Sequence, residues 1–563
     1  MEVAADLSYP LDDRQQSYYE DSSNAIRASA GSNMRRATLI AMIGMVMAKL
    51  TGFLRELLIV PKFGYGLFSD AYINAFMIPD MLYELLIGGV VAAVLTPTLS
   101  AGIESGKEKS AWRQVSIFIS VASVVTFIAL LLAEILASPI MHVMTGAYSE
   151  TASPELIQIT KLAVPVTRIL LFQSILMIFV SFLHGILSAY KRFTPVAIGP
   201  SIYNTFYILA LVLLGQASEK GIQRVAWGVV LAAFSYFCFQ AFAARHELRY
   251  FSFSLDTKDP GFRQLVHLAI PTLISGSVLH LSSLIMNRFT NGLNMPGAVT
   301  AIRQCMTTWG LPYAIFAVSV GNIMLPHIAG FYELSDVKKV RQLYTSSLRQ
   351  ALYAVVPFAL GFAMLSFETI QAIFQWNPEA YTNQQVAATA QTLGWFCVSI
   401  VAQTIVFITN QAFYARRITR ITLFTGLVSL ALNPLFLHIY INVMGKGLVG
   451  IGMAHASYSV VNAILVFILY RWHRPAMRPY RLLPFVIRVV LCALAAALVF
   501  HSLQQIPLFP QNKIVQLLFF GLKFLAGLAT YYIAGVALGL REAVKLQASL
   551  RRFFSLPKLP GQA

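Results

Sequence analysis

Long apolar stretches recur along the chain and alternate with short polar segments. Because a membrane-crossing helix needs about 20 mostly apolar residues, we interpret about fourteen of these stretches as transmembrane spans. In order, they are predicted at 37–60, 70–100, 114–137, 157–186, 196–215, 222–243, 263–290, 297–330, 344–366, 386–413, 421–443, 448–470, 483–503 and 514–538. The pattern predicts an all-α integral membrane protein, with bends or breaks at Pro79 and Pro312 in the two longest spans.

The polar segments predict how the chain is oriented in the membrane. Residues 1–36 are polar and rich in acidic residues, so we predict a disordered cytoplasmic tail there and a second cytoplasmic tail at 541–563. Basic clusters at 191–192, 338–339 and 416–417 all fall in loops on one side of the predicted membrane. Because short basic loops stay in the cytoplasm, both termini are expected there. The same topology accounts for the formal net charge of +18 without nucleic-acid binding.

A faint internal repeat divides the spans. Residues 188–194 (SAYKRFT) align with 413–419 (FYARRIT), and Asn204 and Asn433 are separated by nearly the same interval. An even number of spans separates the copies, so both point the same way, as in transporters with parallel repeats. We predict two parallel six-helix lobes, at 37–243 and 244–472. Spans thirteen and fourteen, within 473–540, have no counterpart and form an appendage.

Basic residues inside the predicted spans are candidate functional groups, because each costs about 2.5–3.5 kcal/mol at the bilayer centre. Their position within the helix separates them. Residues near a span end can extend to the membrane interface, whereas Lys49, Arg55 and Arg303 are predicted to have a functional role. Arg288, close to the outer end of its span, fits either interpretation. Arg55 and Glu56 point roughly 100° apart on one helix, so we expect no direct contact between them. Three of these residues, Arg168, Arg488 and Lys523, are expected to reach an interface. The full set of basic residues within predicted spans is Lys49, Arg55, Arg168, Arg288, Arg303, Arg488 and Lys523.

Acidic residues gather in the second span. Asp80 and Glu84 are four residues apart on one helix face, where two negative charges repel each other. Either one carboxyl group is protonated or a cation, from Lys49 or Arg55, lies beside them. The functional alternative, which stays open, is a proton or cation coupling site. Asp70, at the start of this span, is expected to cap the N-terminus of its own helix.

Several kinds of chemistry have no support in the sequence. The intramembrane histidines lack ligand partners at metal-binding spacing, and there is no Walker sequence or GxSxG motif. The four cysteines stand singly in apolar stretches, as buried structural thiols do. We therefore expect no metal, no cofactor, no nucleotide and no catalytic residue. Transport would draw on the membrane potential or a monovalent cation.

The order of motifs resembles the MurJ/MviN family of lipid II flippases, in the multidrug/oligosaccharidyl-lipid/polysaccharide exporter superfamily. The likeness rests on residues 49–56 (KLTGFLRE), 69–80 (SDAYINAFMIPD), 187–195 (LSAYKRFTP) and 321–326 (GNIMLP), and it covers nearly the whole chain. The resemblance implies fourteen helices in two lobes and a polyprenyl-tail groove formed by the last two. It also implies a central cationic cavity lined by spans one, two, seven and eight.

Carried over residue by residue, the resemblance places Arg55, Glu56, Asp70 and Arg303 at family positions. Lys49 stands where the family usually has arginine, and Tyr83 followed by Glu84 stands where it has another arginine. The candidate substrate contacts are Arg55, Arg303, Lys49, Glu56, Asp70, Arg288 and Tyr83, and the coupling candidates are Asp80 and Glu84.

The leading hypothesis is a flippase that moves lipid II, or another polyprenyl-pyrophosphate-linked saccharide, across the bacterial cytoplasmic membrane by alternating access. Guanidinium groups are well suited to a pyrophosphate. The alternative is a cation-coupled exporter of another lipid-linked oligosaccharide or of a small amphiphile. A non-transporting membrane scaffold is a third possibility, but it gives no reason to retain charges inside specific spans.

Overall fold

A computed structural model describes residues 43–44, 46–87, 91–416, 418–473, 482–506 and 512–554. The described residues are helical apart from short connections, which confirms the all-α prediction. The tail predicted at 1–36 and the end of the C-terminal tail, 555–563, lie outside this part of the chain. The remainder of that predicted tail contains a helix, α20 (Arg541–Phe554).

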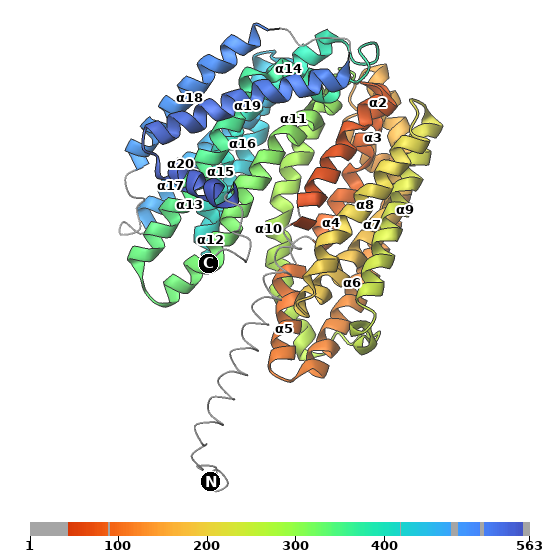
Figure 1. The fold of residues 1–563 in the computed structure, drawn as a ribbon. Helices are drawn as coiled ribbons and strands as arrows, with labels where there is room; N and C mark the ends of the chain where they lie inside the picture. Colours follow the sequence, from red (N-terminus) through yellow and green to blue (C-terminus); the bar gives the residue numbers. More distant parts are fainter. Residues whose placement is uncertain are drawn as a thin grey trace, which may run out of the picture.

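The first half of the chain forms one bundle. A helix over 46–57 begins it. The following elements are α2 (Ile59–Phe63), α3 (Leu67–Ala75), α4 (Met77–Ile87), the π-helix η1 (Val91–Leu95), α5 (Thr96–Glu104), α6 (Glu108–Thr145), α7 (Pro154–Ala189), α8 (Phe193–Leu214), α9 (Glu219–Ala243) and the 3-10 helix η2 (Glu247–Tyr250). Figure 1 shows them, apart from the unlabelled η1 and η2, in red to yellow on one side of the molecule.

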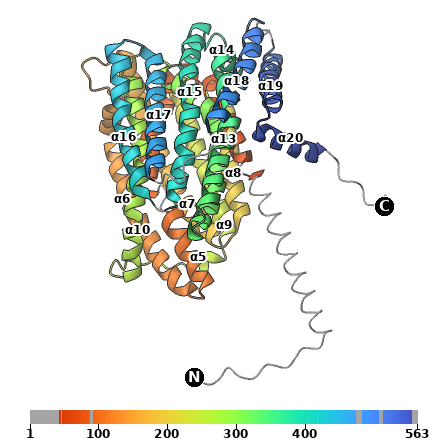
Figure 2. The ribbon, with the colours of Figure 1, turned by 90° about the vertical axis from the view of Figure 1, so that its left-hand side faces the viewer.

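The second half forms a matching bundle, with two further helices along its outer side (Figures 1 and 2). Its elements are α10 (Pro260–Asn291), α11 (Ala298–Pro312), the π-helix η3 (Tyr313–Val318), α12 (Ser319–Glu333), α13 (Val337–Met364), α14 (Ser366–Phe374), α15 (Asn383–Tyr414), α16 (Thr419–Leu437), the π-helix η4 (His438–Val443) and α17 (Gly447–His473). The outer helices are α18 (Leu482–Gln504) and α19 (Lys513–Ala537). Figure 2 shows α20 lying across the direction of the long helices.

The predicted spans agree with these helices in most places. In the described part of the chain, 11 helical stretches are long and apolar enough to cross a membrane. They correspond to predicted spans three to six and eight to fourteen, while the seventh corresponds to α10. The first span lies partly outside the described residues, so the total of about fourteen stays a prediction. α6 is longer than predicted because its polar first turns stay helical, and it ends at Gly146, whose positive φ of 86° is a common helix stop.

The second predicted span is broken rather than continuous. α3 ends at Ala75 and α4 begins at Met77, so the break falls at Phe76, three residues before the position anticipated at Pro79. Proline lacks a backbone N–H, so Pro79 leaves the carbonyl of Ala75 without its usual helical donor. The hydroxyl of Thr167 on α7 donates to that carbonyl at 3.1 Å. The break is thereby stabilised by the neighbouring helix.

The predicted repeat is visible in one pair of equivalent contacts. Asn204 on α8 donates its amide to the carbonyl of Ala48 in the first helix of its lobe, at 3.1 Å. Asn433 on α16 donates in the same way to the carbonyl of Ser282 on α10, at 2.9 Å. In both lobes, therefore, an asparagine on the fifth helix forms a hydrogen bond to the backbone of the first helix. Buried apolar clusters hold the two bundles together; the one centred on the second lobe also includes Val60 of α2 and residues of α18 and α19.

Candidate functional site

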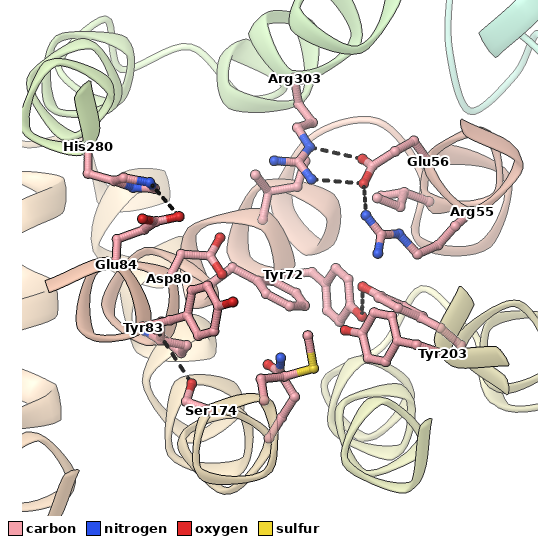
Figure 3. A pocket seen from close by; sticks show the side chains of 17 residues that line it. Arg55, Glu56, Tyr72, Asp80, Tyr83, Glu84, Ser174, Tyr203, His280 and Arg303 are labelled. Atoms are coloured by element: carbon pink, nitrogen blue, oxygen red, sulfur yellow. Dashed lines mark hydrogen bonds and ion pairs between the residues drawn. The ribbon is translucent and has the colours of Figure 1, made fainter. Parts of the chain in front are cut away.

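The central cavity lies between the two lobes and has a volume of about 350 Å³. The first helix, α2, α3, α4, α7 and α8 contribute its lining from the first lobe, and α10 and α11 from the second. Figure 3 shows its charged side chains in two groups. One group is Arg55, Glu56 and Arg303, and the other is Asp80, Glu84 and His280.

The first group is an ion-pair cluster that joins the lobes. Arg303 on α11 donates to Glu56 from Nε to Oε2 at 2.9 Å and from Nη2 to Oε1 at 2.8 Å. Arg55 donates from Nη2 to Oε1 of the same carboxylate at 2.7 Å. Two-pronged guanidinium–carboxylate pairing of this kind is strong and directional. One carboxylate therefore holds two arginines that would otherwise repel each other.

The expectation that Arg55 and Glu56 do not touch was wrong. Their Cα–Cβ bonds point in different directions, but the arginine side chain is long enough for its guanidinium to reach the neighbouring carboxylate. Two residues on α8 hold the guanidinium in that position. The guanidinium carbon lies 4.8 Å from the ring centre of Tyr207, and Nη1 donates to Asn204 Oδ1 at 3.3 Å. Both partners are distant in sequence, so helix geometry alone could not predict the contact.

The second group is mostly acidic. Glu84 pairs with His280 on α10, with 3.2 Å between Oε1 and Nε2. Among the described residues, Lys49 and Arg55 form no hydrogen bond or ion pair with Asp80 or Glu84, although Arg55 acts on Asp80 through space. His280 is one of the intramembrane histidines that the sequence analysis weighed only as metal ligands, although an ionisable residue within a span also indicates a polar partner. Tyr83 also lines the cavity, and its hydroxyl bonds that of Ser181 at 2.7 Å.

Asp70 lies at the lobe interface rather than in the cavity lining. It was expected to cap its own helix, but Gly66 is the N-cap of α3, with Ser69 completing the capping box. Asp70 instead caps α11 of the other lobe. Its Oδ2 accepts from the Gly297 N–H at 2.7 Å, and its Oδ1 accepts from the N–H and hydroxyl of Thr300 at 2.8 and 2.6 Å. Gly297 is the N-cap of α11 and has no side chain, so the cap comes from outside.

Further contacts close the lobes at the same end of the molecule, opposite the basic loops. Asn74 and Asn291 exchange amide hydrogen bonds of 2.9 and 3.1 Å. The rings of Tyr65 and Tyr381 stack with 4.3 Å between their centres. Together with Asp70, these contacts form what we call the interlobe gate.

The two remaining candidate contacts also lie away from the central cavity. Lys49 is exposed on the first helix. The guanidinium of Arg288 packs against Gly146 and lines a separate pocket with Asn294 and Asn442. Their roles as substrate contacts stay predictions. Conversely, Tyr203 and Tyr207 line the cavity although sequence reasoning did not select them.

Comparison with known proteins gives consistent results. The family model described as lipid II flippase MurJ matches residues 59–519. The chain is 22% identical over 528 residues to the probable lipid II flippase MurJ of Rhizobium tropici, covering 92% of this chain and 96% of the relative. It is 23% identical over 445 residues to the lipid II flippase MurJ of Burkholderia cenocepacia, covering 77% and 83%.

Solved structures share the fold. A structure of lipid II flippase MurJ in an inward closed conformation superposes with a TM-score of 0.69 at 17% identity, covering 88% of this chain and 100% of that one. An inward-facing MATE family transporter of the MOP superfamily gives 0.62 at 16% identity, covering 78% and 99%. With the family model spanning most of its length, this multi-pass membrane protein belongs to the lipid II flippase MurJ family.

Proposed function

We propose that this protein translocates lipid II, or a closely related polyprenyl-pyrophosphate-linked saccharide, across the bacterial cytoplasmic membrane by alternating access. The observation that carries the proposal is the Arg55–Glu56–Arg303 cluster, which joins the lobes inside a cavity. Such a cluster offers two guanidiniums to a pyrophosphate, the geometry that suits this anion. Its relatives are flippases, which are transporters and not enzymes.

Substrate binding and lobe movement are coupled through Glu56. The pyrophosphate and the Glu56 carboxylate compete for the same guanidinium donors, so an arriving head group displaces Glu56 from Arg303. That displacement removes hydrogen bonds that hold the lobes in this arrangement. A ligand shifts a conformational equilibrium only by binding one state better than the other. Replacing an interlobe bond with a ligand bond is a direct way to do so.

The lipid tail would occupy an apolar groove of about 660 Å³ between α13, α15, α17 and α18. Its lining is almost wholly aliphatic, with Leu352, Val401 and Val486 as examples. An isoprenoid chain needs such a surface because it offers no hydrogen bonds. The groove includes α18, the first of the two appended helices, in keeping with the tail site that the family resemblance implies for 473–540.

The proposed topology and energy source rest on the pattern of basic loops and of intramembrane charges in the sequence. We place both termini and the basic loops in the cytoplasm, so the interlobe gate closes the cavity towards the outside. Membrane potential or a monovalent cation would drive transport, without nucleotide, nucleic acid or cofactor. Asp80 and Glu84 are the candidate carboxylates for coupling, because both line the cavity.

Native mass spectrometry of the purified protein tests the substrate directly. We expect a co-purified polyprenyl-pyrophosphate saccharide, which is lost in the Arg55→Ala/Arg303→Ala variant. Arg168→Ala is the matched control: it removes an arginine from α7 that pairs with Glu134 at 3.6 Å and does not line the cavity. Retention of the lipid by the double variant, or its loss from the control alone, would overturn the proposal.

A further inference from the structure

The central cavity has two poles of opposite charge. Glu56 is shared by Arg55 and Arg303, so this pole keeps an excess of one positive charge. Across the cavity, Asp80 and Glu84 lie one turn apart on α4 (Figure 3). Counting the two arginines against the three carboxylates leaves one negative charge, which His280 cancels only when it is protonated.

A pyrophosphate alone does not match this charge distribution. It suits the arginine pole, but it would bring further negative charge close to Asp80 and Glu84. Like charges inside a low-dielectric cavity repel strongly. A ligand that satisfies both poles must also carry a positive group.

Among the described residues, Asp80 is the carboxylate of this cavity that has no direct partner: Arg303, His280 and Arg55 act on it through space, without a hydrogen bond or ion pair. Its side chain is exposed to the cavity, and no described residue forms a hydrogen bond or ion pair with its carboxylate. Glu84, by contrast, is already paired with His280. A carboxylate inside a membrane protein is costly unless water or a cation accompanies it. Asp80 is therefore available to a cation that enters the cavity.

We propose that the acidic pole, Asp80 with Glu84, binds a protonated amine on the head group of the same ligand whose pyrophosphate the arginines hold. The inference rests on the proposed function and narrows its substrate class to head groups with an amine. An ammonium is compact and has three donors, which suits two carboxylates one helical turn apart. Because the amine is tethered to the bound pyrophosphate, its effective concentration at Asp80 is far above that of a free cation.

This assignment also accounts for the replacement of a family arginine by Tyr83 and Glu84. Glu84 adds a negative charge at the pole that receives the amine, and Tyr83 lines the same side of the cavity through its bond to Ser181. The cation expected from the sequence beside Asp80 and Glu84 is then supplied by the substrate itself.

Two matched probe lipids test the proposal: a polyprenyl-pyrophosphate saccharide with a primary amine on its head group, and the same lipid with that amine acetylated. Binding to the full chain in nanodiscs is measured for the wild type, Asp80→Asn/Glu84→Gln and Glu104→Gln. The last is a matched carboxylate-to-amide control, since Glu104 pairs with Lys191 on the exposed surface. We expect the wild type and the control to prefer the amine form by about tenfold, and the double variant to bind both forms equally.

The outcomes separate the two levels of the argument. If the wild type binds both probes equally well, the amine proposal is overturned while the flippase proposal stands. If the wild type binds neither probe, both fail. A double variant that keeps the preference places amine recognition elsewhere, and one that loses both probes alike shows a structural role for the carboxylates. Either result overturns the proposal.

Discussion

Replacing Asp70 with asparagine should open the interlobe gate. The carboxylate accepts three hydrogen bonds from the N-terminus of α11, and its side chain is buried between the lobes. Asparagine has the same shape but only one acceptor oxygen. In its best orientation, that oxygen keeps the bonds from Thr300 while the NH2 group faces the N–H of Gly297, so two donors meet.

The size of the effect follows from these bonds. A hydrogen bond to a charged group contributes about 1.5–3 kcal/mol, and the two bonds that remain lose their charge assistance. We expect the closed gate to lose about 2–4 kcal/mol relative to the open one, a shift of roughly 30- to 700-fold in the equilibrium. The lobes themselves should stay folded, because Asp70 belongs to one lobe and its donors to the other.

Distances between spin labels across the gate provide the assay. Labels at Tyr148 and Met444, which are exposed at the gate end of either lobe, should show a longer separation in Asp70→Asn. The matched control is Asp336→Asn, which changes an aspartate that caps its own helix, α13. The N–H of Lys339 lowers the pKa of Asp336, so this control also removes a charge. An unchanged distance distribution in Asp70→Asn would refute the role of this cap in closing the gate.

Three further substitutions test other contacts. Glu56→Gln removes the competitor for Arg55 and Arg303, so affinity for a pyrophosphate lipid should rise by about tenfold while transport falls; unchanged affinity in a binding assay would contradict this. Thr167→Val leaves the Ala75 carbonyl without a donor and should lower the free energy of unfolding by about 1–3 kcal/mol, whereas Thr530→Val, which removes an exposed bond within one helix, should not. Lys523→Met leaves buried Glu368 without its 2.8 Å partner and should cost about 3–5 kcal/mol, most of which Glu368→Gln/Lys523→Met recovers in thermal unfolding.

Much of the fold was predictable from the length and position of the apolar stretches in the sequence. Runs of apolar residues are long enough to specify a spanning helix on their own, and α7, α15 and α17 lie where those runs predict. The paired asparagines, Asn204 and Asn433, signalled the repeat because each fastens two helices in the same way. The break in the second span was predictable in kind, but the hydroxyl that satisfies the freed Ala75 carbonyl belongs to Thr167 on another helix, which the local sequence does not reveal.

The sequence was sufficient to select several residues of the site, but not to predict which of them form hydrogen bonds or ion pairs with each other. The cost of charge in a membrane selected Arg55 and Arg303, because that cost applies whatever the fold. Their partners could not be selected in this way, since a pair forms only where the fold brings two segments together. Lys523 illustrates the limit: expected to extend to an interface, it is buried and bonds Glu368 and the Ile506 carbonyl.

The interlobe gate and the central cluster make different contributions to one conformational equilibrium. Asp70 is buried against α11, out of reach of a ligand in the cavity. Its cap therefore stabilises the closed gate by an amount that does not depend on the ligand. Glu56 lines the cavity, where the anion of the proposed substrate would compete for its arginines. Binding energy can therefore enter the equilibrium through the interlobe pairs that line the cavity, Glu56 with Arg303 and Glu84 with His280, and the Asp70 cap sets how much is required before the lobes move. A weaker cap would let the gate open without substrate, whereas a missing Glu56 would let substrate bind without opening it.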